Sequence, residues 1–285
     1  MKKLLSLILA TALLGASLLC FASCGEEKGP APDELVVATN AAFEPFEYKE
    51  GNLYYGIDIE IMAAVAQKLN KKLIIKNMDF DSVIENVNKR YSSVAAAGLT
   101  VNEQREKLVT FSDTYYDASQ MIIVMESDTT FDGCTTAASV EAILGAMTSS
   151  KEVGVQNGTT GKLYMEGDAD WGFAGYDAQV RGYKSAALAV SDMQNGNIDF
   201  VVVDEGPAKA IAENINATAA ADKRVKVIDI RLTEEQYAFA VAKTNTELLI
   251  AINVILAEMK ADGSFQAIVD KYFSENGTPT GYEGK

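Results

Sequence analysis

From residue 35 onwards, the chain alternates short apolar segments with amphipathic segments of helical period. Residues 94–97 are typical of a buried strand, whereas residues 57–69 repeat apolar side chains every three or four positions. Strands that alternate with helices indicate an α/β fold with largely parallel sheets. The alternation begins again near residue 153, after a looser stretch, so the sequence predicts two α/β lobes.

The expected elements also divide the chain between the lobes. We expect one lobe over residues 33–124 and 238–285, and the other over residues 125–237. Two strand-like crossings, near residues 121–125 and 232–237, would join them. The other expected strands are 35–39, 73–75, 94–97, 153–156, 200–203, 225–230 and 237–242, and the expected helices are 57–69, 81–88, 140–147, one from about 160, 187–194, 207–214, 247–259 and 265–273.

The first residues are typical of a targeting segment rather than of the folded body. Lys2 and Lys3 precede an apolar run, and the small residues Ala22 and Ser23 stand before Cys24. This stretch resembles the lipobox of bacterial lipoproteins, which implies a signal peptide over residues 1–23 and a lipid on Cys24. Residues 24–33 would then be a lipidated linker. A plain signal peptide and an uncleaved anchor remain alternatives, because Phe21 replaces the usual leucine.

Composition excludes several classes of function. The formal charge of −15, or −17 once the two N-terminal lysines are removed, argues against nucleic acid and anionic membrane surfaces as partners. The chain has no histidine, the commonest general base and metal ligand, which weakens a hydrolase interpretation. With Cys24 lipidated, Cys134 would be the one remaining thiol, so we expect no internal disulfide, metal site or cofactor.

Residues 98–105 combine a glycine, a threonine and an arginine at the end of an expected strand. The backbone N–H groups, the Thr100 hydroxyl and the Arg105 guanidinium would then point to one place, where a small carboxylate can bind. The alternative is an ordinary strand–turn–helix with a solvated arginine. A later strand-to-helix turn, at Asp204, carries the opposite charge and favours the binding interpretation.

Taken in order, seven segments resemble the polar amino-acid family of bacterial extracellular solute-binding proteins, which serve ABC importers. The resemblance covers nearly the whole mature chain and implies a two-lobe, type II periplasmic-binding-protein fold. It departs from the family pattern at residues 89–93 and at Asn102 and Glu103. The segments are 36–48 (VVATNAAFEPFEY), 56–60 (GIDIE), 79–81 (DFD), 98–105 (GLTVNEQR), 111–116 (FSDTYY), 154–161 (GVQNGTTG), and 199–204 together with Ala208.

In that family the guest is a free amino acid held by its zwitterion between the lobes. The resemblance assigns the guest's carboxylate to Arg105 and several neighbouring residues, and the guest's ammonium to Asp204. A desolvated carboxylate needs such a cation and several N–H donors in place of water. Asp204 directly follows the strand 200–203, so the alternative is that it only caps the next helix. The other residues assigned to the guest's carboxylate are Gly98, Thr100, Thr159 and Thr160.

Selectivity for the guest's side chain would come from other positions. Phe43 and Phe80 match family positions that clamp the guest, although core packing would explain them equally well. Asn40 stands where relatives often carry an acidic residue, and Gln156 where the residue varies with the ligand. Because both are neutral, we expect a polar uncharged amino acid. Glu44 leaves a cationic guest open.

The predicted function is therefore capture without chemistry. We expect an extracytoplasmic, lipid-anchored monomer that delivers an amino acid to an ABC permease in the membrane. One alternative is an enzyme on the same fold, such as a cyclohexadienyl dehydratase-like protein, for which Glu44, Glu205 and Asp113 are the available proton donors. Another is a ligand sensor that works through a second chain. Glu234, Glu235 and Trp171 are expected to be solvated surface or packing.

Overall fold

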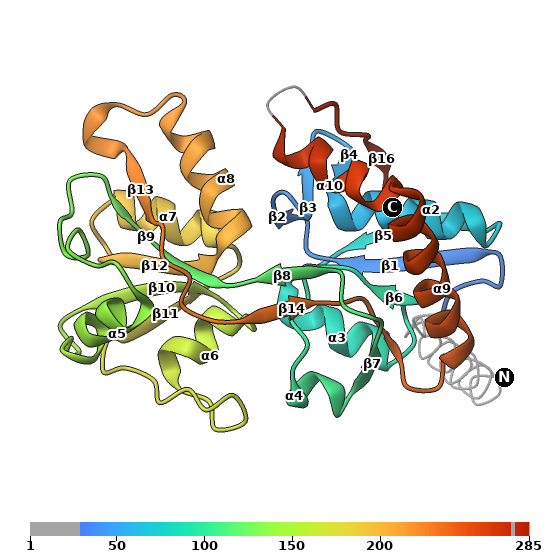
Figure 1. The fold of residues 1–285 in the computed structure, drawn as a ribbon, viewed down its shortest axis with the longest axis horizontal. Helices are drawn as coiled ribbons and strands as arrows, with labels where there is room; N and C mark the ends of the chain where they lie inside the picture. The colour runs from blue at the N-terminus through green and yellow to red at the C-terminus, as the bar shows by residue number, and fades with distance from the viewer. Residues whose placement is uncertain (1–28, 275–276, 285) are drawn as a thin grey trace, which may run out of the picture.

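The computed structural model describes residues 29–274 and 277–284, which form two α/β lobes side by side (Figure 1). Each lobe contains a five-stranded, mostly parallel sheet with helices on both sides. The predicted two-lobe α/β fold is therefore confirmed. The expected signal peptide and Cys24 lie outside the described residues.

The sheet of the first lobe has the strand order β5-β1-β6-β15-β7. β1 pairs in parallel with β5 and β6, whereas β15, which returns from the other lobe, is antiparallel to both of its neighbours. The expected strand over residues 237–242 is wrong as a single element, because its first residue belongs to a crossing and its end to this sheet. The bounds are β1 (Glu34–Thr39), β5 (Lys72–Asn77), β6 (Val94–Ala95), β7 (Val109–Phe111) and β15 (Ala240–Ala242).

Helices and a small antiparallel sheet cover the first lobe. The small sheet has the order β16-β4-β3-β2, and none of its short strands was expected. No helix among the described residues has the length and apolar character needed to cross a membrane. The elements are β2 (Ala42–Phe43), β3 (Glu47–Glu50), β4 (Leu53–Tyr55), β16 (Tyr282–Glu283), α2 (Ile57–Lys68), α3 (Phe80–Asn88), α4 (Glu103–Glu106), α9 (Thr246–Asp262) and α10 (Ser264–Phe273).

The second lobe repeats the same strand plan, with the order β11-β10-β12-β9-β13. β10 is parallel to β11 and β12, and β9 is antiparallel to β12 and β13. The carboxyl ends of β10 and β12 therefore share one edge. The elements are β9 (Gln120–Met125), β10 (Glu152–Gln156), β11 (Gln179–Tyr183), β12 (Phe200–Asp204), β13 (Val225–Ile228), α5 (Ala137–Gly145), α6 (Thr160–Glu166), α7 (Ala186–Gln194), α8 (Glu205–Asn216) and the 3₁₀ helix Ala221–Lys223.

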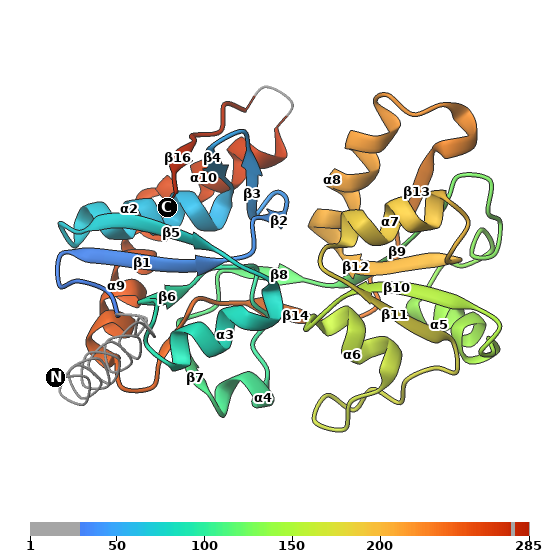
Figure 2. The ribbon, with the colours of Figure 1, turned by 180° about the vertical axis from the view of Figure 1, so that it is seen from behind.

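Two antiparallel strands, β8 (Tyr116–Ala118) and β14 (Glu235–Tyr237), join the lobes, as Figure 2 shows from behind. β14 lies within the expected crossing over residues 232–237. The other expected crossing, over residues 121–125, is wrong: this run lies inside the second sheet as β9, between β12 and β13. Its side chains are apolar because two neighbouring strands and the helices bury them.

The two lobes share an apolar core. One cluster of buried side chains contains Val37 and Ile61 from the first lobe and Val201 from the second. Phe46 and Tyr237 belong to the same cluster, with ring centroids 5.0 Å apart and nearly perpendicular planes. The structure therefore shows the lobes in contact.

Candidate functional site

Four strand ends meet where the lobes touch. Asn40 follows β1 and Gly98 follows β6 in the first lobe, while Gln156 and Asp204 end β10 and β12 in the second. Gln156 Nε2 donates to Asn40 Oδ1 across the interface at 2.9 Å. This is the position at which open α/β sheets bind ligands, at the carboxyl ends of parallel strands.

Arg105 lies at this junction with 8% of its surface exposed. The Asn102 side chain caps α4 by accepting from the Arg105 backbone N–H at 2.8 Å, which fixes where the short helix begins. The guanidinium donates from Nη1 to Thr100 O at 2.6 Å and from Nη2 to Gly158 O, in the other lobe, at 3.1 Å. It also lies 5.4 Å from the centre of the Phe80 ring. Arg105 is therefore a buried cation that is hydrogen-bonded to both lobes, and not a solvated one.

Asp204 supplies the opposite charge from the second lobe, with 4% exposure. It occupies the N-cap position of α8, as expected, but its side chain does not cap the helix. Instead, Tyr237 Oη donates to Asp204 Oδ1 at 2.6 Å. Burial, and then the nearby charge of Glu235, raise the pKa of Asp204 to about 7, while hydrogen bonds from Tyr237 and Gln120 oppose the shift.

The loop between β10 and α6 brings the predicted threonines to the junction. Thr159 Oγ1 donates to Gln156 O at 2.8 Å, so its hydroxyl is already occupied. Thr160 is 2% exposed, and its Oγ1 has no hydrogen-bond partner among the described residues. Of the two hydroxyls, that of Thr160 is therefore the one available to a guest.

Other partnerless polar atoms gather around the same place. Within the described residues, Gln156 Oε1, Gln120 Oε1, Thr39 Oγ1 and both carboxyl oxygens of Glu47 are buried without a hydrogen-bond partner. An unsatisfied buried polar atom costs about 1–3 kcal/mol, so native proteins tolerate few of them. Gln156 and Gln120 lie at the interlobe junction, so their free oxygens make it the candidate site for a polar molecule.

The remaining predicted residues have mixed surroundings. Asn40 Nδ2 donates to Met78 O at 2.7 Å, in addition to accepting from Gln156. Phe43 is packed among aromatic rings, 6.1 Å from Phe46 by centroids, which resembles core packing more than a clamp.

Gly98 has a φ of +53°, and a Cβ there would lie 2.7 Å from the Phe43 ring. Its backbone N–H donates to Asp58 Oδ2 at 3.0 Å, so this donor is not directed at a guest.

One expected surface residue is buried at the same junction. Glu235 is 4% exposed and accepts hydrogen bonds from Thr100, Gln120 and Thr233. The expectation that it is solvated was wrong because strand β14 alternates its faces: Glu234 and Gln236 are exposed, whereas Glu235 and Tyr237 are buried. That alternation was the signal that could have identified it.

Two further buried carboxyl groups, Glu47 and Asp58, were not among the predicted site residues. Asp58 Oδ1 accepts from Tyr115 Oη at 2.5 Å, and burial raises the pKa of Asp58 to about 7. Burial raises the pKa of Glu47 well above its ordinary value, with added repulsion from Asp58 and Asp204. Both lie in segments that resemble the family, 36–48 and 56–60, but no local pattern marks them as buried.

The three carboxyl groups considered for an enzyme have other partners. Glu44 Oε2 accepts from Asn214 at 2.9 Å, and Glu205 Oε1 pairs with Lys209 at 2.7 Å. Asp113 accepts from Asn253 at 3.2 Å. Trp171 is half-buried and lies against Phe173, as expected for packing.

Exposed pairs also hold the lobes together at the rim. Lys184 Nζ lies 2.9 Å from Asp79 Oδ2, and Lys107 Nζ lies 3.2 Å from Asp170 Oδ2. A hollow of about 170 Å³ is lined by Asp79, Phe80 and Lys184, together with Asp81 and Asn157. It therefore opens between the lobes beside the predicted site.

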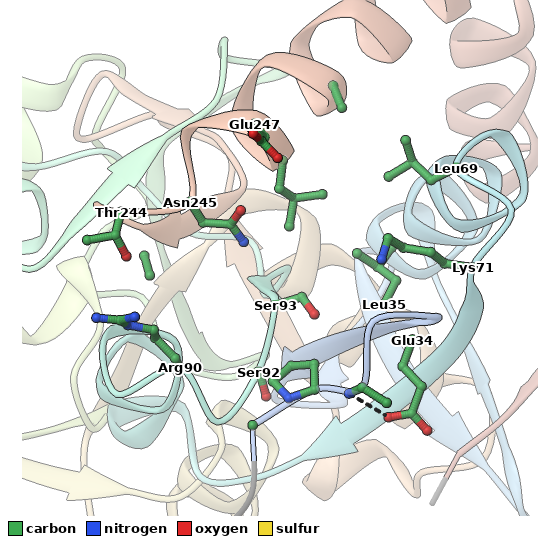
Figure 3. Close-up of a pocket in the computed structure, with 16 residues that line it drawn as sticks. Glu34, Leu35, Leu69, Lys71, Arg90, Ser92, Ser93, Thr244, Asn245 and Glu247 are labelled. Carbon is green, nitrogen blue, oxygen red and sulfur yellow. Dashed lines mark hydrogen bonds between the residues drawn. The ribbon is translucent and has the colours of Figure 1, made fainter.

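A larger hollow, of about 640 Å³, lies at the other end of the first lobe (Figure 3). Its lining includes Glu34, at the start of β1, and the cations Lys71 and Arg90. The described lining contains none of the predicted ligand-binding residues. Since β1 begins here and ends at the interlobe junction, the two places are separated by the length of the strand.

Comparison with known proteins identifies the family to which the chain is similar. Residues 35–275 match the bacterial extracellular solute-binding proteins, family 3. The arginine-binding extracellular protein ArtP of Bacillus subtilis (strain 168) is 28% identical over 276 residues, which cover 96% of this chain and 99% of ArtP.

The similar solved structures are also of amino-acid-binding proteins. An ancestral arginine-binding protein, solved bound to glutamine and bound to arginine, is 33% identical in both cases, with TM-scores of 0.72 and 0.70. The matches cover 86% and 85% of this chain and 100% and 99% of those chains. The ancestral amino acid-binding protein AncCDT-1, a precursor of cyclohexadienyl dehydratase, is 28% identical with a TM-score of 0.69, over 85% of this chain and 96% of that one.

Proposed function

The chain belongs to the bacterial extracellular solute-binding proteins, family 3, and on that premise we propose that it captures a free amino acid for an ABC importer. The observation that carries this proposal is that two buried groups of opposite charge, Arg105 and Asp204, reach the junction from opposite lobes. They are close enough for the charge of Asp204 to act on the guanidinium. A zwitterion is the small molecule whose two charges match them.

The carboxylate of the guest is assigned to the side of Arg105. A desolvated carboxylate needs a cation and hydrogen-bond donors, and the guanidinium supplies up to five N–H groups in a planar fork. In this structure two of these N–H groups donate to backbone carbonyls, Thr100 O and Gly158 O, and the remaining ones would serve the carboxylate. The partnerless Thr160 hydroxyl would donate to the same carboxylate.

The ammonium is assigned to Asp204. A bound cation next to this carboxyl favours its ionised form, so binding would lower a pKa that burial has raised to about 7. The ammonium is attracted to Asp204 and repelled by the Arg105 guanidinium, so the two charges together fix the orientation of the guest between the lobes.

For the guest's side chain, we propose a polar uncharged group. The bonded amides of Asn40 and Gln156 have no net charge, and Gln156 Oε1 remains without a partner within the described residues. Glu44, which could serve a cationic guest, is held by Asn214, and Asp79 is paired with Lys184. The ancestral relative was solved with both glutamine and arginine, so a cationic guest is the alternative that calorimetry must decide.

Capture would proceed by closure of the lobes. The guest contacts groups from both lobes, so it stabilises the closed form more than the open one and shifts the equilibrium between them. We propose the crossing strands β8 and β14 as the hinge. The lobe boundaries would then lie at these strands, in place of the boundary at residues 124 and 125.

Isothermal titration calorimetry against the twenty amino acids tests the function. We expect heat with a polar uncharged amino acid and none with arginine or lysine. Arg105→Ala and Asp204→Ala should each weaken binding by about 2–5 kcal/mol, the range for removing one half of a desolvated charge pair. Full affinity in either variant would remove that residue from the site, and binding of arginine alone would overturn the selectivity.

We also propose that Cys24 is lipidated and that the protein acts as a monomer outside the cytoplasm. The sequence before Cys24, which lies outside the described residues, supports the lipid and the location, whereas the monomeric state is a prediction from the sequence. Replacing Cys24 by alanine should move the protein from the membrane fraction to the supernatant, as measured by fractionation. An unchanged membrane fraction would favour an uncleaved anchor.

An enzyme on this fold is the second candidate, because Asp204 is a buried acid with a raised pKa and AncCDT-1 is a structural relative. We favour binding, since Glu44, Glu205 and Asp113 all have other partners. Turnover of prephenate or arogenate, measured by product formation, would instead favour the enzyme.

A further inference from the structure

The second crossing strand touches both poles of the proposed site. Glu235 and Tyr237 are two residues apart on β14, so their side chains lie on the same face of the strand. Glu235 accepts from Thr100 in the first lobe, and Tyr237 donates to Asp204 in the second. We propose that Glu235 and Tyr237 are positioning residues, through which the hinge strand orients the carboxylate pole and the ammonium pole together.

Glu235 holds three segments of the chain at one point. Its Oε2 accepts from Thr100 Oγ1 at 2.7 Å, and its Oε1 accepts from Gln120 Nε2 at 3.0 Å and Thr233 Oγ1 at 2.6 Å. Thr100 is therefore fixed twice, through its hydroxyl by Glu235 and through its carbonyl by Arg105. The negative charge of Glu235 also acts on the guanidinium without touching it.

Tyr237 holds the other pole. Its ring is fully buried, with centroids 5.0 Å from Phe46 and 5.8 Å from Tyr116, so the hydroxyl has little freedom to move. Its backbone bridges to Thr100, which ties it to the carboxylate side. The 2.6 Å hydrogen bond to Asp204 Oδ1 therefore fixes the orientation of the carboxyl group.

The two residues act on Asp204 in opposite directions. The hydrogen bond from Tyr237 favours the ionised form of Asp204, whereas the negative charge of Glu235 disfavours it. The other groups that face this carboxyl are Gln120 on β9, Glu47 on β3 and the Arg105 guanidinium on α4. The guest's ammonium needs an ionised Asp204, so affinity should fall as the pH drops through the pKa of this group.

This inference rests on the proposed function, but it can be tested without a ligand. We would prepare Tyr237→Phe, Glu235→Gln and the control Glu234→Gln, which makes the same chemical change on the exposed face of β14. The first readout is carboxyl ¹³C NMR of the ligand-free full chain between pH 4 and 9, with the Asp204 signal assigned by its loss in Asp204→Asn. The second is the affinity for L-glutamine, by calorimetry, over the same pH range.

We expect opposite shifts. In Tyr237→Phe the Asp204 midpoint should rise by about one pH unit, because a hydrogen bond to the ionised form is lost. In Glu235→Gln the Asp204 midpoint should fall, because a neighbouring negative charge is removed. In Glu234→Gln the midpoint should stay at the wild-type value. The pH at which L-glutamine affinity is half lost should move in the same directions.

A purely structural role predicts a different result. Each variant would then lose affinity equally at every pH with no change of midpoint, and this outcome, or two shifts of the same sign, would overturn the proposal. If one variant fails to fold, the sign of the shift in the other decides. If L-glutamine does not bind the wild type, glutamine is excluded as the guest, whereas the ligand-free titration still decides the roles of Glu235 and Tyr237.

Discussion

Thr160 offers a test in which affinity and stability should respond differently to one substitution. Its hydroxyl is 2% exposed and has no partner among the described residues, although it lies at the start of α6, beside the proposed carboxylate pole. Thr160→Val keeps the branched shape and removes only the hydroxyl. A folded protein that uses this hydroxyl for its own stability should lose stability, whereas one that keeps it for a guest should not.

The expected magnitudes follow from that geometry. A hydrogen bond to a charged group contributes about 1.5–3 kcal/mol, so the loss of the hydroxyl should weaken amino-acid binding roughly 10- to 150-fold. In the absence of ligand, no hydrogen bond within the described residues is lost and a partnerless buried group is removed. The free energy of unfolding should therefore stay equal or rise by up to about 1 kcal/mol.

Calorimetry of binding and urea unfolding of the ligand-free protein measure the two quantities. Thr218→Val is the matched control, since Thr218 is exposed in the same lobe, and it should change neither. A fall in ligand-free stability by more than about 1 kcal/mol, with unchanged affinity, would show that the Thr160 hydroxyl is structural.

Two further predictions concern charge. Burial raises the pKa of Glu47 above its ordinary 4.5, so the folded state keeps a proton that the unfolded state loses, and stability should fall as the pH rises above that value. Glu47→Gln should therefore raise the melting temperature at pH 8 but hardly at pH 5, as measured by differential scanning fluorimetry. An equal change at both pH values would contradict the argument that ionisation of the buried Glu47 destabilises the fold. Lys184 and Asp79 form an exposed interlobe pair, so Lys184→Gln should weaken binding less than about fivefold at low salt and not at all in 1 M NaCl. A salt-independent loss would point to a direct contact with the guest.

The fold could be predicted well from local patterns. Alternating strands and helices gave two α/β lobes, because apolar period and element length are local properties of the sequence. The crossing was misplaced because β9 and a buried linker look alike as apolar runs. The difference lies in the pairing of β9 with β12 and β13, which depends on contacts between distant residues.

The placement of the two charged groups was predictable because each follows a strand end, whereas their role in binding stays a prediction. Arg105 and Asp204 both lie at the interlobe junction, because strand ends of the two separate sheets face each other there, as the Gln156–Asn40 hydrogen bond shows. Glu235, Asp58 and Glu47 were missed, since whether a carboxyl group is buried depends on the packing of the other lobe and of the hinge. Glu235 in particular is buried by residues more than a hundred positions away, including Thr100 and Gln120.

A crystal structure of the chain with the amino acid that gives heat in calorimetry is the most direct test. We predict that its carboxylate lies against the Arg105 guanidinium and its ammonium against the Asp204 carboxylate, with both lobes in contact with it. A guest bound instead in the hollow lined by Lys71 and Arg90, or held by one lobe alone, would contradict the proposed capture between opposite charges.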